Sequence, residues 1–161
     1  TKGIALDLAC GLGTNSLFLA TRGLEVHAWD ISKVAVNDLA GRAGSLGLNI
    51  QTRVVNITAA VLPAESYDLV INGTSAGLSH QDLEISGSVI TGNTCCYDMI
   101  YGAGITRFNQ WCQQQAECVV ADGLGMLVEQ AALAFMIWFG GQVNTAPDTQ
   151  LVIDTIRSNL D

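Results

Sequence analysis

The chain has 161 residues, of which 49% are hydrophobic and only 14% are charged. Seven lysines and arginines stand against fifteen aspartates and glutamates, which gives a formal net charge of −8. Because nucleic-acid binding requires a basic surface that displaces counterions, this composition argues against a nucleic-acid partner. We find no apolar run long enough to cross a membrane and no signal peptide, and the length suits one domain.

The cysteines favour a reducing, cytoplasmic setting. They are Cys10, Cys95, Cys96, Cys112 and Cys118, an odd number without a C-x-x-C pair. Adjacent residues such as Cys95 and Cys96 point to opposite faces of a strand. We therefore expect reduced, buried thiols rather than disulfides or a metal site.

Short apolar runs alternate with amphipathic segments through most of the chain. Strands are expected at Ile4–Ala9, Glu25–Asp30, Ile50–Asn56, Tyr67–Asn72, Thr94–Ile100 and Glu117–Ala121. Helices are expected at Asn15–Arg22, Ser32–Leu46, Thr106–Gln115, Leu124–Trp138 and Pro147–Leu160, with Ser32 as an N-cap and Pro147 in a first turn. Such alternation predicts an α/β, doubly wound, Rossmann-like domain: a mostly parallel, six-stranded sheet with helices on both faces.

A glycine-rich turn follows the first expected strand and opens the first helix. Gly11 and Gly13 let the backbone turn tightly and approach a ligand closely. About twenty residues further on, Asp30 ends the second strand, where its carboxylate can accept hydrogen bonds from both ribose hydroxyls of a nucleotide. The alternative is that Asp7 and Asp30 only cap and solvate the ends of their strands.

The first part of the chain resembles a methyltransferase family. The phrases LDLACGLGTNSLFLA (6–20), EVHAWD (25–30) and NIQTRVVN (49–56) are similar to S-adenosylmethionine-dependent methyltransferases of the tellurite-resistance type, over about residues 1–70. The resemblance implies a cofactor site. Its expected residues are Asp7, Gly11, Gly13 and Asn15 for the methionine part, Asp30 and Ile31 for the ribose, and Asn56 for the adenine. Asn56 stands where the family has an acid. Its side chain keeps a carbonyl acceptor for the adenine amino group but lacks the negative charge.

A nicotinamide cofactor is the competing interpretation, because Gly11-x-Gly13-x-x-Ser16 approximates the dinucleotide fingerprint. NADP requires an arginine or hydroxyl cluster after the second strand to meet its 2′-phosphate, whereas Asp30 would repel that phosphate. We therefore expect S-adenosylmethionine to lead with weak affinity, NAD to be the alternative, and NADP to be the least suitable of the three.

The later part of the chain resembles another family. The phrases DLVINGTSAGLS (68–79), CYDMIY (96–101) and ADGLGMLVEQAALAF (121–135) are similar to the C-terminal, NADP-binding half of shikimate dehydrogenases, over about residues 68–161. The resemblance implies residues near the nicotinamide at Thr74, Ser75, Met99, Gly123 and Met126, and residues near the shikimate hydroxyls at Tyr101 and Gln130. The alternative is that the two methionines only fill the core and that Gln130 faces water.

No catalytic constellation is evident in the sequence. His27 lies in an apolar strand, which is typical of a packed histidine, and His80 has no partner acid at a recognisable spacing. We find no Ser-His-Asp order, paired carboxylates or metal-ligand spacing, and therefore predict no catalytic residues and no metal. Because the chain starts just before its first strand, we also expect no separate catalytic domain within it.

Together these patterns predict one domain built from two kinds of segment. Residues 1–70 would be methyltransferase-like and residues 71–161 dehydrogenase-like, joined near the fourth strand, where YDLVI suits either family and keeps the sheet in register. We expect an engineered chimera without native catalytic activity that retains weak binding of an adenosine-type ligand. The alternative is a functional S-adenosylmethionine-dependent methyltransferase-like protein or an NAD(P)-binding shikimate-dehydrogenase-like protein.

The segment Leu124–Phe139 is apolar nearly all round, so a helix here must be buried on more than one side. The terminal helix covers part of it. If this cover is too small, the remaining surface predicts a homodimer through the last two helices; if it suffices, the chain is a monomer. A small nucleotide-type ligand and a second copy are thus the expected partners.

Overall fold

The structure, a computed structural model, describes residues 2–57, 65–76, 85–139 and 145–160. Its strands are β1 (Ile4–Leu8), β2 (Glu25–Asp30), β3 (Ile50–Val54), β4 (Leu69–Asn72), β5 (Cys95–Asp98) and β6 (Val119–Asp122). Its helices are α1 (Thr14–Thr21), α2 (Lys33–Leu46), α3 (Arg107–Gln115), α4 (Leu124–Phe139) and α5 (Thr149–Leu160), with a 3-10 turn η1 (Gly87–Val89). Every expected strand and helix is present, with ends shifted by a few residues.

The helix starts show how local sequence sets the element bounds. Ser32 caps α2 as expected, because its side-chain oxygen accepts a hydrogen bond from the Ala35 amide at 3.3 Å. The expectation for Pro147 is wrong, since this proline precedes α5 instead of lying in its first turn. Asp148 caps α5, with its carboxylate accepting from the Leu151 amide at 3.0 Å.

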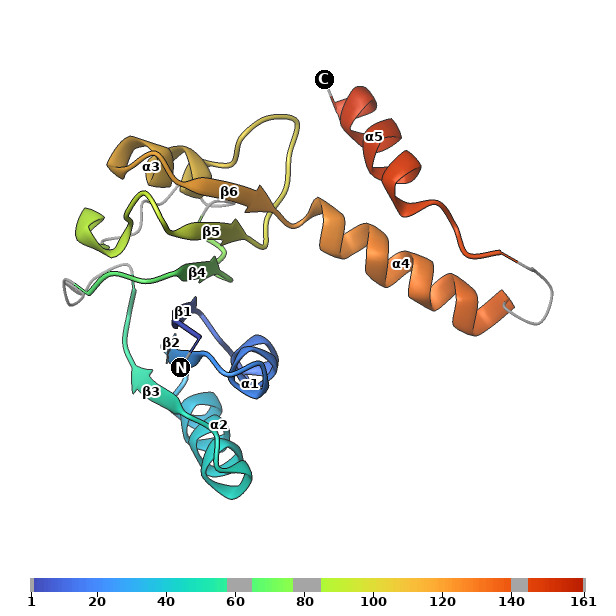
Figure 1. The fold of residues 1–161 in the computed structure, drawn as a ribbon. Helices are drawn as coiled ribbons and strands as arrows, with labels where there is room; N and C mark the ends of the chain where they lie inside the picture. Colours follow the sequence, from blue (N-terminus) through green and yellow to red (C-terminus); the bar gives the residue numbers. More distant parts are fainter. Residues whose placement is uncertain (1, 58–64, 77–84, 140–144, 161) are drawn as a thin grey trace.

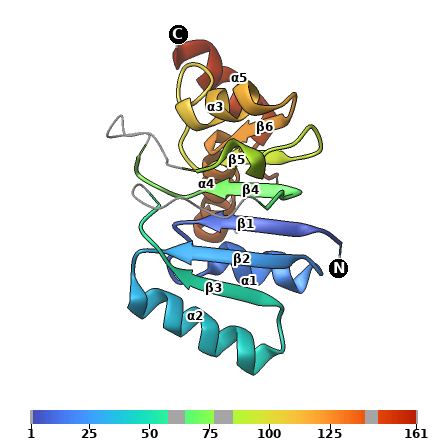
Figure 2. The same ribbon diagram turned by 90° about the vertical axis from the view of Figure 1, so that its left-hand side faces the viewer.

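The six strands form one sheet in the order β3-β2-β1-β4-β5-β6, and each neighbouring pair is parallel (Figure 2). The expected doubly wound fold is therefore confirmed. Its strand order reverses between β1 and β4, and in open parallel sheets the crevice at such a reversal, outside the carboxyl ends of the strands, is where ligands bind.

The two expected segments meet inside this sheet rather than at a boundary between domains. β4 pairs with β1 on one side and with β5 on the other, in continuous parallel registers. The backbone continues the pairing beyond both ends of β4: the Asp68 amide donates to Ile4 at 2.9 Å and the Gly73 amide to Leu8 at 2.9 Å. The strand near which the join is predicted is therefore hydrogen-bonded to a neighbour on each side.

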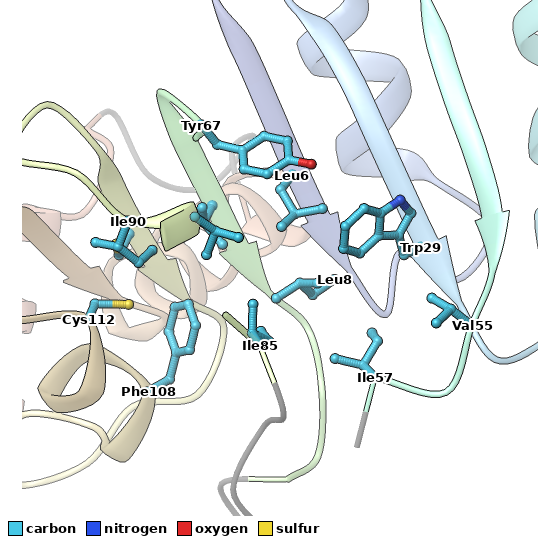
Figure 3. Packing of buried hydrophobic residues seen from close by; sticks show 13 residues of the cluster. Leu6, Leu8, Trp29, Val55, Ile57, Tyr67, Ile85, Ile90, Phe108 and Cys112 are labelled. Atoms are coloured by element: carbon cyan, nitrogen blue, oxygen red, sulfur yellow. The ribbon is translucent and has the colours of Figure 1, made fainter. Parts of the chain in front are cut away.

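The larger hydrophobic core covers the sheet face on which α3 packs. Leu6 and Leu8 of β1 and Trp29 of β2 project into it, and Phe108 and Cys112 of α3 close it from above (Figure 3). All five side chains are at most 6% exposed. This core draws on residues from both expected segments.

A second core covers the opposite face and is built from smaller side chains. Ala5 of β1 and Val26 and Ala28 of β2 pack against Ala20 of α1 and Leu39 of α2. Because alanine occupies most strand positions on this face, α1 and α2 lie close to the sheet. This close packing fixes the start of α1, where the glycine-rich turn is found.

The last two helices depart from the layered arrangement. α4 leaves the end of β6 and runs away from the sheet, and α5 returns beside it (Figure 1). In α4 only Leu124 and Val128 are buried, while Trp138 is 73% exposed. The expectation that α4 is buried on more than one side is therefore wrong for a single copy of the chain, because α5 covers only one side of it.

Candidate functional site

The turn between β1 and α1 has an unusual backbone. Ala9, Gly11 and Gly13 all have positive φ angles, of 56°, 54° and 77°. At Gly13 a side chain has no room, since a Cβ atom would lie 2.3 Å from the Leu39 side chain of α2. The turn is therefore pressed against α2, and its glycine is required by both conformation and packing.

Asp30, at the end of β2, holds this turn from the side. One carboxylate oxygen accepts a hydrogen bond from the Gly11 amide at 2.8 Å, and the other accepts one from the Ser32 amide at 2.7 Å. A carboxylate has about four acceptor positions, so two remain for a ligand. The two amides orient the carboxylate, and Asp30 is 9% exposed at the carboxyl edge of the sheet. The site thus has a preoriented anionic acceptor pair.

Asp7 lies beneath the turn and is only 1% exposed. Its carboxylate accepts a hydrogen bond of 2.5 Å from the Ser16 hydroxyl, which ties β1 to α1. Burial raises the pKa of Asp7 to about 6, with a smaller contribution from the charge of Asp30, while the hydrogen bonds from Ser16 lower it. Asp7 therefore braces the start of α1, and its direct contact with a ligand stays a prediction.

This raised pKa predicts a pH-dependent stability. Below pH 3.8, the ordinary pKa that Asp7 has in the unfolded chain, its carboxyl group is protonated in the folded and the unfolded state alike. As the pH rises to about 6 and beyond, the buried carboxyl group must ionise in the folded state, which lowers the free energy of unfolding. We expect Asp7→Asn to raise the free energy of unfolding by roughly 2 kcal/mol at about pH 8 and to change it little near pH 4. Urea unfolding at both pH values measures this, with the exposed Glu117→Gln as control. An equal effect at the two pH values would contradict the role of burial.

In the first turn of α1, Asp7 already accepts hydrogen bonds from the hydroxyl and the amide of Ser16. Gly13 is the N-cap of α1 and provides no side-chain hydrogen bond, and the first turn contains no acidic residue. Free amides at a helix N-terminus favour phosphate or carboxylate groups. The side-chain amide of Asn15 lies 3.7 Å from the Met99 sulfur, so residues expected from the two families meet here across the β1–β4 crevice.

The ends of β4 and β5 carry a buried polar pair that sequence reasoning missed. The Asn72 amide group donates to the Asp98 carboxylate at 3.1 Å, and its carbonyl oxygen accepts from the Thr74 amide and hydroxyl at 3.1 and 2.7 Å. Both Asn72 and Asp98 are 1% exposed, and burial raises the pKa of Asp98. Their position at the carboxyl ends of neighbouring strands was the available signal. The pair thus fixes Thr74, just after β4.

The remaining expected residues are spread over the same edge of the sheet and over α4. Ile31 is 67% exposed and Tyr101 is 41% exposed, while Asn56 and Ser75 are also exposed. Gly123 is buried, and a Cβ atom there would lie 2.1 Å from the Met99 carbonyl oxygen. On α4, Met126 is partly buried and Gln130 is exposed. Their ligand contacts stay predictions.

A basic residue beside Asp30 was also missed. Lys33 is exposed at the first position of α2, three residues after the carboxylate. A cation there weakens the electrostatic argument against a 2′-phosphate. The signal was the short DISK phrase that links β2 to α2.

The histidines add no catalytic group to the described part of the site. His27 is 7% exposed, and its Nδ1 lies 2.9 Å from the Tyr67 hydroxyl, as expected for a packed histidine. His80 lies outside the described residues. Within the described ranges, no group of three or more His, Cys, Asp or Glu side chains could hold a metal ion, and no helix is long and apolar enough to span a membrane.

Two family models match the chain, in different parts. The model of the tellurite resistance protein TehB matches residues 1–100, and that of the shikimate 5′-dehydrogenase C-terminal domain matches residues 123–155. Both resemblances expected from the sequence are confirmed. The first match extends past residue 70, so the position of the join stays a prediction.

The curated relatives are named as shikimate dehydrogenases, and their matches are longer than residues 68–161. The shikimate dehydrogenase (NADP(+)) of Hydrogenovibrio crunogenus is 45% identical over 124 residues, which are 75% of this chain and 43% of that protein. The enzyme of the same name from Vibrio atlanticus is 44% identical over 97 residues, or 60% of this chain and 34% of that protein. The chain spans less than half the length of these relatives. Their names give no support to the expectation that NADP is the least suitable cofactor.

Solved structures match the fold over nearly the whole chain. An Ael1 enzyme from Pseudomonas putida is 29% identical with a TM-score of 0.71, covering 95% of this chain and 54% of that chain. A shikimate dehydrogenase in complex with NADP+ is 16% identical with a TM-score of 0.70, covering 99% of this chain and 55% of that chain. Both expected segments therefore share one Rossmann-like arrangement.

Proposed function

The chain belongs to the TehB family, and from this premise we propose that the carboxyl edge of its sheet binds an adenosyl cofactor of the S-adenosylmethionine type. The observation that carries the proposal is Asp30, whose two oxygens are oriented by the Gly11 and Ser32 amides. The two acceptor positions that remain match the two hydroxyls of an adenosine ribose. Gly11 supports a close approach, because a Cβ built on it meets nothing within 4 Å.

The charged end of such a ligand has a place as well. S-adenosylmethionine carries a carboxylate, and the first turn of α1 offers it the backbone amides that precede the Ser16 amide, which Asp7 accepts. Asn15 and Met99, which face each other across the crevice, would lie along the sulfur-containing part of the cofactor. The proposed ligand thus extends from Asp30 over the glycine-rich turn toward the end of β5.

NAD is the second candidate, and the strand order favours it. A parallel sheet in the order β3-β2-β1-β4-β5-β6 is the dinucleotide-binding arrangement, in which a pyrophosphate lies at the first helix N-terminus. NAD presents the same ribose diol to Asp30. NADP would bring its 2′-phosphate beside the Asp30 carboxylate, which the cation of Lys33 offsets in part, so we rank it third although the relatives are named as NADP(+) enzymes.

Parallel calorimetric titrations with S-adenosylhomocysteine, NAD and NADP test this ranking. We expect S-adenosylhomocysteine to bind with a dissociation constant of tens of micromolar or weaker, about −6 kcal/mol, NAD to bind more weakly, and NADP to bind weakest. Asp30→Asn removes the charge but keeps one acceptor, and should therefore narrow the gap between NAD and NADP. Tighter binding of NADP than of both other ligands to the unmodified chain would contradict the proposal.

We infer further that this 161-residue chain binds without turning over substrate. Support comes from the described site, where the buried acids Asp7 and Asp98 are engaged in hydrogen bonds with neighbouring side chains. Sustained reduction of NAD or NADP with shikimate by the purified chain, above a mock preparation, would contradict this inference.

The two family matches in one sheet also lead us to propose an engineered recombination as the origin of the chain. A natural genome that encodes these residues as one uninterrupted frame would contradict that origin.

A further inference from the structure

The α4–α5 hairpin carries the largest uncovered apolar surface of the described residues. Nine large apolar side chains of these two helices are between 37% and 73% exposed, led by Trp138 and Ile137. Monomeric proteins rarely leave apolar patches of more than about 300–600 Å² in water. This surface therefore requires a covering partner.

The hairpin has a groove on one side. It has a volume of about 460 Å³ and is lined by apolar residues, among them Leu127, Ala131 and Phe135 of α4 and Val152 and Ile156 of α5. Because the Ala131 side chain is small, the groove has room for a large side chain. Arg157 anchors α5 beside this groove, because it pairs with Asp122 at 2.5 Å and donates to the Gly102 carbonyl at 3.0 Å. The groove is thus held open by a fixed pair of helices.

The same helix presents a side chain suited to this groove. Trp138 follows groove-lining Phe135 by three residues and therefore lies on the same face of α4, one turn beyond the groove. Ile137, two residues after Phe135, does not share that face. A groove and a protruding indole on one face satisfy the condition for a two-fold interface, in which the same patch serves both partners.

We propose that this face joins two copies of the chain. Two antiparallel α4 helices, related by a two-fold axis, set Trp138 of each copy into the groove around Ala131 of the other. The two hairpins then form a four-helix arrangement of the kind that buries apolar helix faces in bundles. This interface is independent of the cofactor proposal, because it uses no residue of the glycine-rich turn.

The exposed side chains and the charge fit this occupant. Besides Leu133 and Ile137, which lie away from the groove, seven large apolar side chains of the hairpin are exposed and can be covered by the second copy. Glu129 is the one charged residue of α4, and it does not line the groove. Asp154 and Arg157 of α5 do not line the groove either, so the groove can meet its copy without opposing like charges, although the chain carries a net charge of −8.

Sedimentation equilibrium of the full chain tests the interface with a matched pair of variants. Trp138→Ala and Ile137→Ala each truncate an apolar side chain of nearly equal exposure, 73% and 72%, on different sides of α4. We expect a dimer for the unmodified chain, at least a tenfold weaker dimer for Trp138→Ala, and a change of less than about threefold for Ile137→Ala. Circular dichroism checks that both variants remain folded.

Three results would overturn the proposal. One is a monomer at high micromolar concentration, which would mean that the face is not an interface between copies. Another is equal weakening by the two variants, which would remove the assignment of Trp138 to the groove. The third is open-ended assembly, which a closed two-fold dimer does not permit.

Discussion

Gly123→Ala is expected to lower the free energy of unfolding by about 3 kcal/mol, the upper end of the cost of overpacking. A Cβ atom at this position would lie 2.1 Å from the Met99 carbonyl oxygen and 2.7 Å from its carbonyl carbon. Both atoms belong to the backbone at the end of β5 and cannot rotate away. The Gly123 amide also donates to the Ile100 carbonyl at 3.1 Å, so any shift breaks the link between the ends of β5 and β6.

Gly125→Ala is the matched control, two residues further along the same segment. A Cβ there meets nothing within 4 Å, and Gly125 lies inside α4. Because alanine favours the helix over glycine, we expect this variant to gain about 0.5–1 kcal/mol. Urea unfolding of both variants measures the difference. Similar midpoints for the two would show that the contact with Met99 does not constrain the fold.

Asp30→Ala is expected to weaken the binding of S-adenosylhomocysteine and NAD at least about 100-fold. The substitution removes the acceptors for both ribose hydroxyls, and each hydrogen bond to a charged group contributes about 1.5–3 kcal/mol. It also frees the Gly11 and Ser32 amides, so the turn loses the group that orients it. Calorimetric titration measures the loss.

The structural and binding contributions of Asp30 can be separated. Freed amides also destabilise the fold by about 1–3 kcal/mol, which a thermal unfolding curve reports independently of ligand. Glu117→Gln is the control, because it neutralises an exposed acid far along the chain from the turn. A folded Asp30→Ala variant that binds within about threefold of the unmodified chain would exclude the carboxylate as the ribose acceptor.

The strands and the fold class followed closely from the sequence because buried parallel strands form short, nearly continuous apolar runs. β2 was predicted to its exact ends, and the cap at Ser32 had a clear local signal. Pro147 was misplaced because a proline suits both the first turn and the residues before a helix. Asp148, the adjacent residue, provides the cap instead.

The site was predictable where it depends on local motifs, and less so where it depends on contacts between distant strands. The glycine-rich turn and Asp30 lie together as expected. The pairing of Asn72 with Asp98 depends on the register between β4 and β5, which no local pattern reveals. The sequence likewise did not reveal why residue 123 must be glycine, because the group that excludes a side chain there is the distant Met99 backbone.

The exposure of α4 is the clearest case in which composition misled. An apolar helix implies burial, but the sequence does not state whether the covering surface belongs to the same molecule. The described residues cover Leu124 and Val128 and leave Trp138 in solvent. The prediction that α4 is buried on more than one side is therefore wrong for a single copy, and the dimer proposed above would supply the missing cover.

The central claim, that Asp30 and the glycine-rich turn form a site for an adenosyl ligand, is tested most directly by amide NMR during a titration with S-adenosylhomocysteine. The Gly11 and Ser32 amides both donate to Asp30, so a ligand that binds this carboxylate must perturb them. We expect the largest shifts at these two amides and at Gly13, with the Ala131 region of α4 unchanged. Shifts confined to the α4–α5 groove, or no shift at millimolar ligand, would contradict the account.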